Sequence, residues 1–125
     1  MAPVTPHLPR QVPIEAYGNG GFRFADMSHR GSLLSLPSGL WAWDPRRPED
    51  IDEAALARVA AEASAIDIFI LGTGPSIWAM PESLRWHLRD LRVGLEILST
   101  GAAVRTYNIL LGERRRVAAA FIAVD

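Results

Sequence analysis

The run VAAAFIAV at residues 117–124 is apolar at every position. A strand with one face in solvent alternates apolar and polar side chains, whereas a strand covered on both faces reads as an unbroken apolar run. We therefore place this segment inside a sheet. Residues 66–71 and Gly94–Leu98 predict two further strands, and stretches with helical spacing separate the three. Strands and helices that alternate in this way are typical of an α/β domain.

Three helices are predicted around these strands. The first follows Asp50, which resembles the first residue of a capping box. The second begins at Pro81, a residue suited to the first turn of a helix. The third runs over residues 101–113 after a cap at Ser99 or Thr100. Their expected buried faces consist of Leu56, Val59, Ala60 and Ala63, then of Leu84, Leu88 and Leu91, and finally of Ala103, Tyr107, Leu110 and Leu111.

The N-terminal third is strand-like and interrupted by turns. Residues 14–17 and 22–26 flank Gly-Asn-Gly-Gly, a composition that tolerates positive φ and predicts a hairpin. A second turn is expected at residues 29–31, before short strands at 33–36 and 41–43. The whole pattern predicts a three-layer α/β domain, with a mixed sheet of about five strands, helices on both faces and an N-terminal antiparallel hairpin.

The first residues of the chain are rich in proline and carry no apolar core of signal-peptide length. We expect residues 1–12 to form a flexible Pro-rich tail and residues 13–125 to form a single domain. No run approaches the roughly 20 apolar residues of a membrane helix, so neither a membrane span nor a secretory signal is predicted. These expectations indicate a cytoplasmic protein.

The composition removes several kinds of chemistry. The chain has no Cys, which excludes disulfides, thiol nucleophiles and cysteine-ligated metals. All 13 basic residues are Arg, so a Schiff-base lysine and a phosphate-loop lysine are absent as well. A formal net charge of -1 argues against a generic nucleic-acid binder. The three His lack metal-ligand spacing and no Ser–His–Asp set can be assigned, so no metal, no cofactor and no enzymatic activity are expected.

The G-T-G turn at residues 72–74, between a predicted strand and a predicted helix, has two interpretations. In the dinucleotide-binding fingerprint G-x-G-x-x-G the third glycine lets the helix pack closely on the strand, but Ile77 occupies that position here. The next helix is expected only at Pro81, although Glu96 supplies an acidic residue at about the distance of the fingerprint. We therefore favour a tight connecting turn, in which the glycines adopt conformations closed to other residues.

A ligand site at the same turn stays open as an alternative. Two successive strand–helix loops that emerge at one sheet edge would place the turn beside residues 99–101, and a shallow crevice between them could hold an anion. The residues of this candidate site are Gly72, Thr73, Gly74, Ser76, Ser99 and Thr100.

Protein binding is the other interpretation of the surface. Arg85, Arg89 and Arg92 recur at i, i+4 and i+7 along the second helix, which fits either a solvated face or a docking surface. Trp78 lies in a Gly/Pro-rich loop outside the helical pattern, which favours an exposed side chain that could anchor a partner. These four residues are the candidate partner-binding set.

Tyr107 and Asn108 are expected on the inner side of the third helix. A buried hydroxyl or amide must find partners, because an orphaned polar group costs about 1–3 kcal/mol. We predict that Asn108 hydrogen-bonds to the backbone of a neighbouring loop, so that the pair forms a structural clasp rather than a catalytic dyad.

Several segments together resemble a known family. YGNGGFRF, RGSLLSLPSGLWAW, DIFILGTG and GLEILSTGAAVRTYNILLGERRRVAAAFI occur in this order and spacing. They are similar to the small domain-of-unknown-function family that includes mitochondrial respiratory complex I assembly factor 3 and the adipogenesis-associated domain protein. The resemblance covers about residues 12–124. Its most specific parts are the G-T-G turn and the T-x-A-x-x-T-Y-N helix start, within which this chain carries Gly101 as a slight departure.

The resemblance implies a three-layer α/β fold around a mixed five-stranded sheet with a small antiparallel addition. It implies no catalytic residues. The mitochondrial members act in complex I (NADH dehydrogenase) assembly by binding other proteins. A bacterial stand-alone member is therefore expected to be a non-enzymatic protein-binding or assembly-factor-like module with protein partners, and the small-ligand or anion crevice is the alternative.

Overall fold

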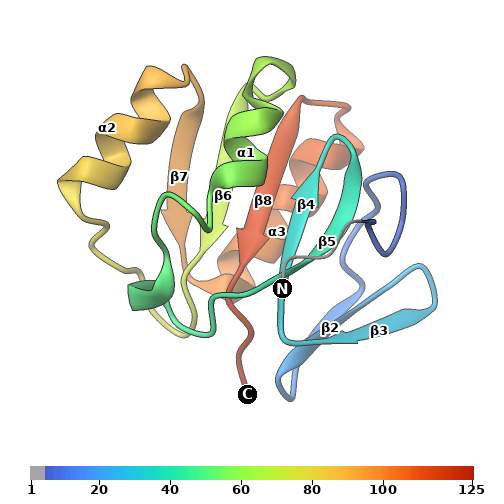
Figure 1. The fold of residues 1–125 in the computed structure, drawn as a ribbon. Coiled ribbons are helices and arrows are strands. Elements are labelled where there is room, and N and C mark those ends of the chain that lie inside the picture. Colours follow the sequence, from blue (N-terminus) through green and yellow to red (C-terminus); the bar gives the residue numbers. More distant parts are fainter. Residues whose placement is uncertain (1–4) are drawn as a thin grey trace.

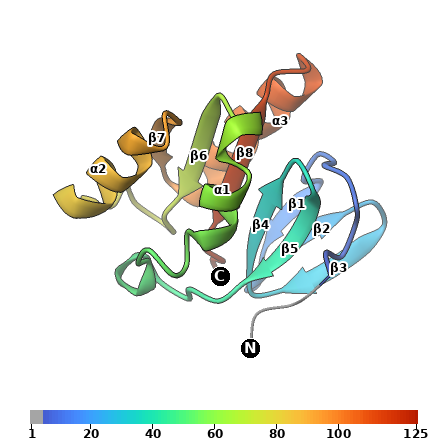
Figure 2. The same cartoon turned by 45° about the horizontal axis from the view of Figure 1, so that its top comes forward.

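The computed structural model describes residues 5–125. Its strands are β1 (Ala16–Gly18), β2 (Gly21–Phe24), β3 (Met27–Arg30), β4 (Ser32–Leu36), β5 (Gly39–Trp43), β6 (Ile68–Gly72), β7 (Gly94–Leu98) and β8 (Val117–Phe121), and its α-helices are α1 (Ala57–Ala61), α2 (Glu82–Asp90) and α3 (Thr100–Gly112). A five-stranded mixed sheet has the order β5-β4-β8-β6-β7, and a three-stranded antiparallel sheet has the order β1-β2-β3. Helices α1 and α2 cover one face of the large sheet and α3 covers the other (Figure 1; Figure 2).

Strand β8 is the centre of the large sheet, as its unbroken apolar run predicts. It pairs antiparallel with β4 and parallel with β6, and all five of its residues are buried. Ala118 and Ala120 pack in the core cluster with α1 and α2. Val117, Ala119 and Phe121 pack in the cluster with α3 and the small sheet. The predicted three-layer domain, the mixed sheet and the N-terminal hairpin are confirmed.

The small sheet contains a strand that the sequence pattern does not reveal. Residues 29–31 are predicted as a turn, but β3 extends over Met27–Arg30 and pairs with β2. The chain reverses instead at Ala25 and Asp26, whose φ angles of 46° and 62° give the left-handed geometry of a two-residue hairpin. Alanine seldom adopts positive φ, so composition does not mark this turn.

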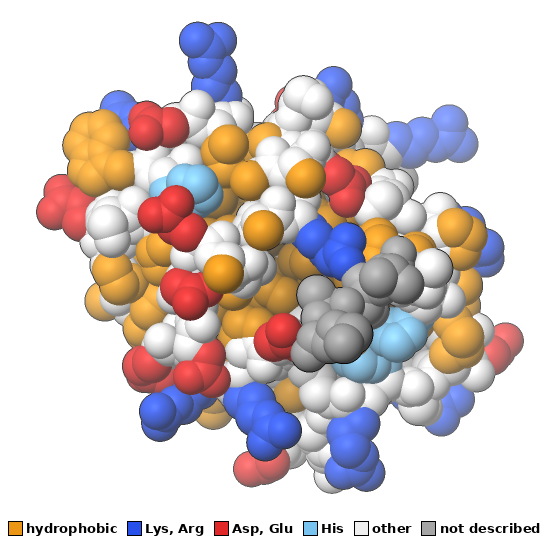
Figure 3. Space-filling view, viewed as in Figure 1, with side chains coloured by type: hydrophobic (Ala, Val, Ile, Leu, Met, Phe, Trp, Pro, Cys, Tyr) orange, Lys and Arg blue, Asp and Glu red, His pale blue; other side chains and the backbone are white. Residues whose placement is uncertain are grey.

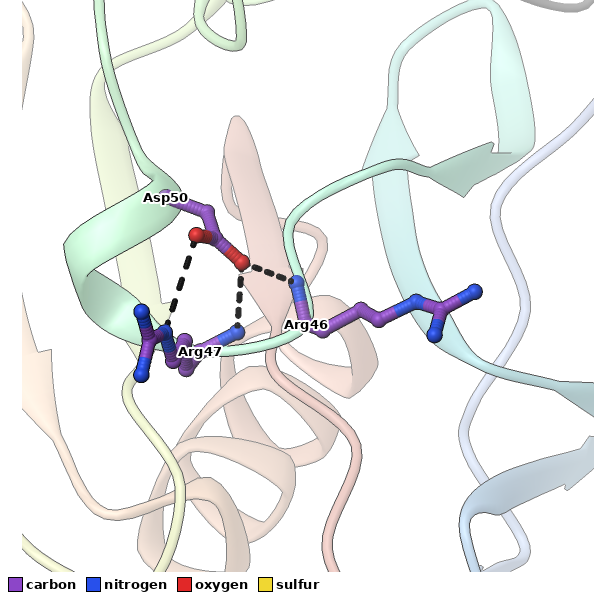
Figure 4. A network of polar contacts seen from close by, with 3 residues as sticks. All are labelled: Arg46, Arg47 and Asp50. Carbon is purple, nitrogen blue, oxygen red and sulfur yellow. Dashed lines mark hydrogen bonds and ion pairs between the residues drawn. The ribbon is translucent and has the colours of Figure 1, made fainter.

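Helix α1 is shorter than predicted, and Asp50 does not cap it. The Asp50 carboxylate accepts hydrogen bonds from the backbone N–H groups of Arg46 (3.1 Å) and Arg47 (3.3 Å), around a short 3-10 helix (Figure 4). Asp52 accepts instead from the N–H of Ala55 (2.8 Å), ahead of α1. The predicted cap is wrong because the Asp50 carboxylate already serves the preceding turn.

Part of the segment expected to be a flexible tail lies on the domain. The N–H of His7 donates to the carbonyl of Leu40 in β5 (2.6 Å). The Gln11 side chain donates to the carbonyl of Val117 in β8 (2.8 Å). Residues 1–4 of the expected tail lie outside the described residues.

The face that α1 and α2 cover carries interspersed acidic and basic side chains, with apolar side chains between them (Figure 3). The mixture agrees with the formal net charge of -1. Between residues 5 and 125, no helix has both the length and the apolar composition needed to cross a membrane.

Candidate functional site

The hydroxyl of Thr73 closes the G-T-G turn. Its Oγ1 donates to the carbonyl of Ser76 (2.8 Å) and accepts from the N–H of Trp78 (3.1 Å), so the loop after β6 folds back on its own start. The Thr73 N–H donates to the carbonyl of Leu98 at the end of β7 (2.9 Å). Thr73 is only 2% exposed. The hydroxyl expected to face a crevice therefore holds the backbone of its own loop.

The hydroxyl of Thr100 joins three elements at the same end of the sheet. Thr100 is the first residue of α3 and is fully buried. Its Oγ1 donates to the carbonyl of Ile122, just after β8 (2.6 Å), and accepts from the N–H of Gly74 (2.9 Å). The Thr100 N–H donates in turn to the Gly74 carbonyl (2.8 Å). Both threonines of the predicted ligand site thus spend their hydroxyls on internal hydrogen bonds.

Gly72 ends β6 and lets α3 lie close to the strand. A Cβ at this position would be 3.0 Å from the Cβ of Ala103 and 3.0 Å from the Cα of Thr100. In a dinucleotide fingerprint, the third glycine allows close packing of the helix that follows directly. Here the first glycine of the turn allows it for a later helix, and the helix that follows the turn begins only at Glu82. These contacts support the interpretation as a connecting turn.

An open depression of about 420 Å³ lies beside the turn. Of the six predicted ligand-binding residues, Gly74 and Ser99 line it. Ser99 is the N-cap of α3, and its hydroxyl accepts from the N–H of Ala102 (3.4 Å). The basic side chain in the lining is that of Arg105, which is exposed on α3. The sequence pattern did not single out Arg105, because nothing in helical spacing marks a lone exposed arginine.

Gly101, in the first turn of α3, lies against Tyr17 of β1. A Cβ on Gly101 would collide with the Tyr17 hydroxyl oxygen. The small sheet therefore packs on the first turn of α3 at a position where any larger residue would displace the tyrosine ring.

Tyr107 and Asn108 tie α3 to the segment that precedes β1. Asn108 Oδ1 accepts from the N–H of Ile14 (2.9 Å), and its Nδ2 donates to the carbonyl of the same residue (2.9 Å). The Tyr107 hydroxyl donates to the carbonyl of Val12 (2.8 Å) and shares a hydrogen bond with Ser35 Oγ (2.7 Å). The predicted hydrogen bond from Asn108 to the backbone of a neighbouring segment is confirmed.

Asn108→Ala is expected to lower the melting temperature by several degrees. The variant leaves both backbone groups of Ile14 without their partner, which costs about 1–2 kcal/mol of stability. A loss of this size lowers the melting temperature of a domain of about this length by several degrees. Differential scanning calorimetry measures the shift. Thr106→Ala, a change on the same helix outside the clasp, serves as control. An unchanged melting temperature together with lost partner binding would show that Asn108 serves function rather than structure.

Tyr107 makes the stability of the fold sensitive to alkaline pH. Burial raises the pKa of its hydroxyl to about 12, and the hydrogen bond with Ser35 partly opposes this effect. The unfolded chain loses the same proton near pH 10, so it binds fewer protons than the folded chain above that pH. The free energy of unfolding is therefore independent of this proton below pH 10, and it falls by roughly 1.4 kcal/mol per pH unit between pH 10 and pH 12.

Urea unfolding at several alkaline pH values checks this dependence. The slope is expected to disappear in Tyr107→Phe and to persist in Tyr17→Phe, since Tyr17 is exposed. Equal slopes in the two variants would rule out Tyr107 as the cause.

The partner-binding candidates do not all lie where the pattern places them. Trp78, expected to be exposed, is half-buried and packs against the core cluster of α1 and α2. Trp86 on α2 is the exposed tryptophan, at 53%. Arg85 and Arg89 are exposed on α2, and the Arg89 guanidinium lies 5.1 Å from the centre of the Trp86 ring. Arg92 follows the helix with a φ of 61° and so leaves the stripe.

The three histidines lie in two places. His87 Nδ1 on α2 is 3.4 Å from a carboxylate oxygen of Glu53. The rings of His7 and His29 are 4.7 Å apart, and burial, followed by the charge of His29, lowers the pKa of His7. In the described part of the chain, no group of three or more His, Asp or Glu side chains is arranged to hold a metal ion.

Several solved structures share this small α/β fold, in which a three-stranded sheet is added to a mixed sheet between helices. A solved protein of Bartonella henselae, described as an outer membrane protein, is 49% identical with a TM-score of 0.91, covering 95% of this chain and 100% of that one. A Rhodopseudomonas palustris protein is 56% identical with a TM-score of 0.85, covering 98% and 90%. A Bordetella pertussis protein described as an Mth938-like domain is 25% identical with a TM-score of 0.79, covering 98% and 92%. The fold is Mth938-like.

The chain belongs to the family described as protein of unknown function (DUF498/DUF598), whose model matches residues 14–122. An uncharacterized protein of Rhodobacter capsulatus is 38% identical over 98% of this chain and 93% of its own length. NADH dehydrogenase (ubiquinone) 1 alpha subcomplex assembly factor 3 of Xenopus tropicalis is 28% identical over 87% of this chain, which spans 60% of that protein. The family resemblance of the quoted segments is confirmed.

Proposed function

We propose that this chain is a cytoplasmic, non-enzymatic protein-binding module that assists the assembly of a respiratory NADH dehydrogenase. Relatives named as assembly factors of that enzyme support the class of partner, namely its protein subunits. Because the chain spans about 60% of the Xenopus tropicalis factor, the proposal concerns the activity of this domain by itself.

The exposed side chain of Trp86 carries the proposal. It lies on α2 between Arg85 and Arg89, and these three exposed residues form the α2 surface. Ile77, in the loop that leads to α2, is 68% exposed. Tryptophan and arginine are the residues most enriched where protein interfaces concentrate their binding energy. The Trp86 ring is half-exposed, and the buried leucines of α2 hold the helix on the core. Such a ring is suited to fill a pocket on a partner protein.

The two threonines of the predicted ligand site support binding rather than catalysis. The hydroxyls of Thr73 and Thr100 are buried and engaged with backbone groups, so neither is placed to attack a substrate. Within the described residues, every buried side-chain nitrogen or oxygen atom has a hydrogen-bond partner. Because these buried polar groups are already hydrogen-bonded inside the fold, we expect the domain to act through its surface.

Trp86→Asp tests the proposal, with Ile109→Asp as matched control. Ile109 is 61% exposed on α3, which covers the other face of the sheet. In a strain that lacks the gene, the wild type and the control are expected to restore the assembled NADH dehydrogenase on native gels. Loss of a hot spot costs about 2 kcal/mol or more, roughly thirtyfold in affinity, so Trp86→Asp should restore little. Equal restoration by both variants, or normal assembly without the gene, would contradict the proposal.

A small-anion site in the depression beside Ser99 is the second candidate. The exposed Arg105, the N-terminal turn of α3 and Asp125 line that depression. The arginine and the helix N-terminus favour a bound negative charge, whereas the Asp125 carboxylate opposes it. A thermal-shift screen of phosphates, nucleotides and carboxylates tests it, with Arg105→Ala as control. A stabilisation that disappears in the variant supports the site, and no stabilisation near millimolar ligand removes it.

A further inference from the structure

Strand β7 is an uncovered edge of the large sheet. At the opposite edge, the N-terminal segment borders β5, with hydrogen bonds from His7 to Leu40 and from Leu40 to Leu8. Strand β7 pairs with β6 alone and lies outermost beside α2 (Figure 1). An edge strand presents a row of unpaired backbone groups that another strand can join.

The register identifies which groups of β7 are free. The N–H of Gly94 (3.0 Å) and the carbonyl of Leu98 (2.9 Å) both bond toward the β6 side. In a parallel pair, alternate residues address the same neighbour, so the N–H and C=O groups of Leu95 and Ile97 point outward. Over residues 5–125, no hydrogen bond beyond the β6 ladder reaches these outward groups.

The side chains of this edge differ between its two faces. Leu95 and Ile97 are half-buried against the core cluster of α2. Glu96 is exposed on the other face, the one that α3 covers, and has no ion-pair partner in the described part of the chain. A strand that joins β7 would therefore meet an apolar surface on one face and a lone carboxylate on the other.

The charges at this edge disfavour a second copy of the chain. An antiparallel pair of β7 strands that uses all the outward groups of Leu95 and Ile97 places Glu96 directly opposite its own copy. Directly opposed like charges destabilise a strand pair. The same two-fold arrangement places both α2 helices on one face of the joined sheet. His87, on one flank of α2, contacts Glu53 in the segment before α1 of its own chain. The opposite flanks, which carry Arg85 and Arg89, would therefore face each other across the two copies.

We propose that the outward edge of β7 binds an extended segment of a partner protein as an added strand, with a basic residue opposite Glu96 and apolar residues on either side of it. The inference rests on the proposed protein-binding function, and it names the part of the partner that this domain recognises. Backbone hydrogen bonds supply the attachment in such strand addition, and the side chain opposite Glu96 supplies the selectivity.

The first test uses two synthetic peptides with a central lysine or a central glutamate between valines. NMR titration of the wild-type protein is expected to shift the amide signals of Leu95 and Ile97, with the lysine peptide bound about fivefold more tightly. Glu96→Lys is expected to reverse that preference. Signals that move elsewhere, no binding of either peptide, or equal binding of both would overturn the inference.

Two further variants test the backbone groups and the charge of this edge separately. Ile97→Pro removes an outward N–H while the ladder to β6 keeps its bonds, so it should abolish peptide binding, with the fold checked by circular dichroism. Glu96→Val removes the like-charge conflict and should self-associate in sedimentation equilibrium, whereas the wild type stays monomeric. A wild-type dimer that Ile97→Pro dissociates would show that the edge serves self-association instead.

The same variants separate this inference from the proposed function. If Glu96→Lys restores NADH dehydrogenase assembly as well as the wild type while Trp86→Asp does not, the proposed function stands and the β7 inference fails. If the peptides bind as expected but Trp86→Asp restores assembly fully, strand addition at β7 stands and the proposed role of the α2 surface fails.

Discussion

The substitution Thr100→Val is expected to lower the free energy of unfolding by about 2–4 kcal/mol. Valine keeps the shape of threonine but removes the hydroxyl that donates to the Ile122 carbonyl and accepts from the Gly74 N–H. Both backbone groups belong to buried residues, and each buried group left without a partner costs about 1–3 kcal/mol. Urea unfolding followed by circular dichroism measures the loss.

Thr100→Ser is the matched control because it keeps the oxygen and removes only a methyl group. It is expected to cost about 1 kcal/mol, the value of a small cavity. A valine variant as stable as the serine variant would mean that the hydroxyl does not hold the turn, the start of α3 and the end of β8 together.

Gly72→Val is expected to destabilise the domain by about 3 kcal/mol. Glycine inside a strand is itself unfavourable, and valine has a high strand propensity, so local preference alone predicts a gain of about 0.5–1 kcal/mol. The tertiary structure reverses the sign of this stability change. A Cβ would meet the Cβ of Ala103 and the Cα of Thr100 at 3.0 Å, and neither of these atoms can move without α3.

Gly112→Ala is the control for the general effect of removing a glycine. Gly112 ends α3, and a Cβ there would meet nothing within 4 Å. Alanine should therefore stabilise the helix by about 0.5–1 kcal/mol. Thermal unfolding of both variants should show shifts of opposite sign, and a stabilised Gly72→Val would contradict the close approach of α3.

The two substitutions act on one joint, where the ends of β6, β7 and β8 meet the start of α3. The threonine hydroxyls at this joint are engaged inside the protein, so a ligand would have to use the rim at Ser99 and Arg105. The proposed protein contacts use the α2 surface and β7, where a tryptophan ring and strand backbone groups face outward.

Local sequence patterns predict much of the fold. The continuous apolar run predicts β8 at the centre of the sheet, and Gly94–Leu98 coincides with β7. The leucines of the second helix and the inward position of Asn108 follow from a period of 3.6 residues. These features depend on residues close in sequence, so their physical causes can be read directly from the chain.

Two errors of the sequence interpretation concern aromatic exposure and local capping. Trp78 lies in a loop that the Thr73 hydroxyl folds back toward the core, a contact that loop composition does not reveal. Trp86 is two residues from both Leu84 and Leu88, which places it opposite the buried stripe of α2, so helical geometry could have identified it. Asp50 has the composition of a helix cap but serves the turn before the helix.

The layers of this protein follow from its amino-acid sequence alone, because burial at a period of two or 3.6 residues is a property of each segment. The partners of the polar groups, in contrast, depend on how distant segments pack together. Whether Thr100 faces a ligand or the Ile122 carbonyl, and whether Leu95 and Ile97 leave their backbone groups free, depends on which distant segments lie alongside. A hydrogen bond acts within about 3 Å, and no local pattern encodes which partner, many residues away, arrives within that distance.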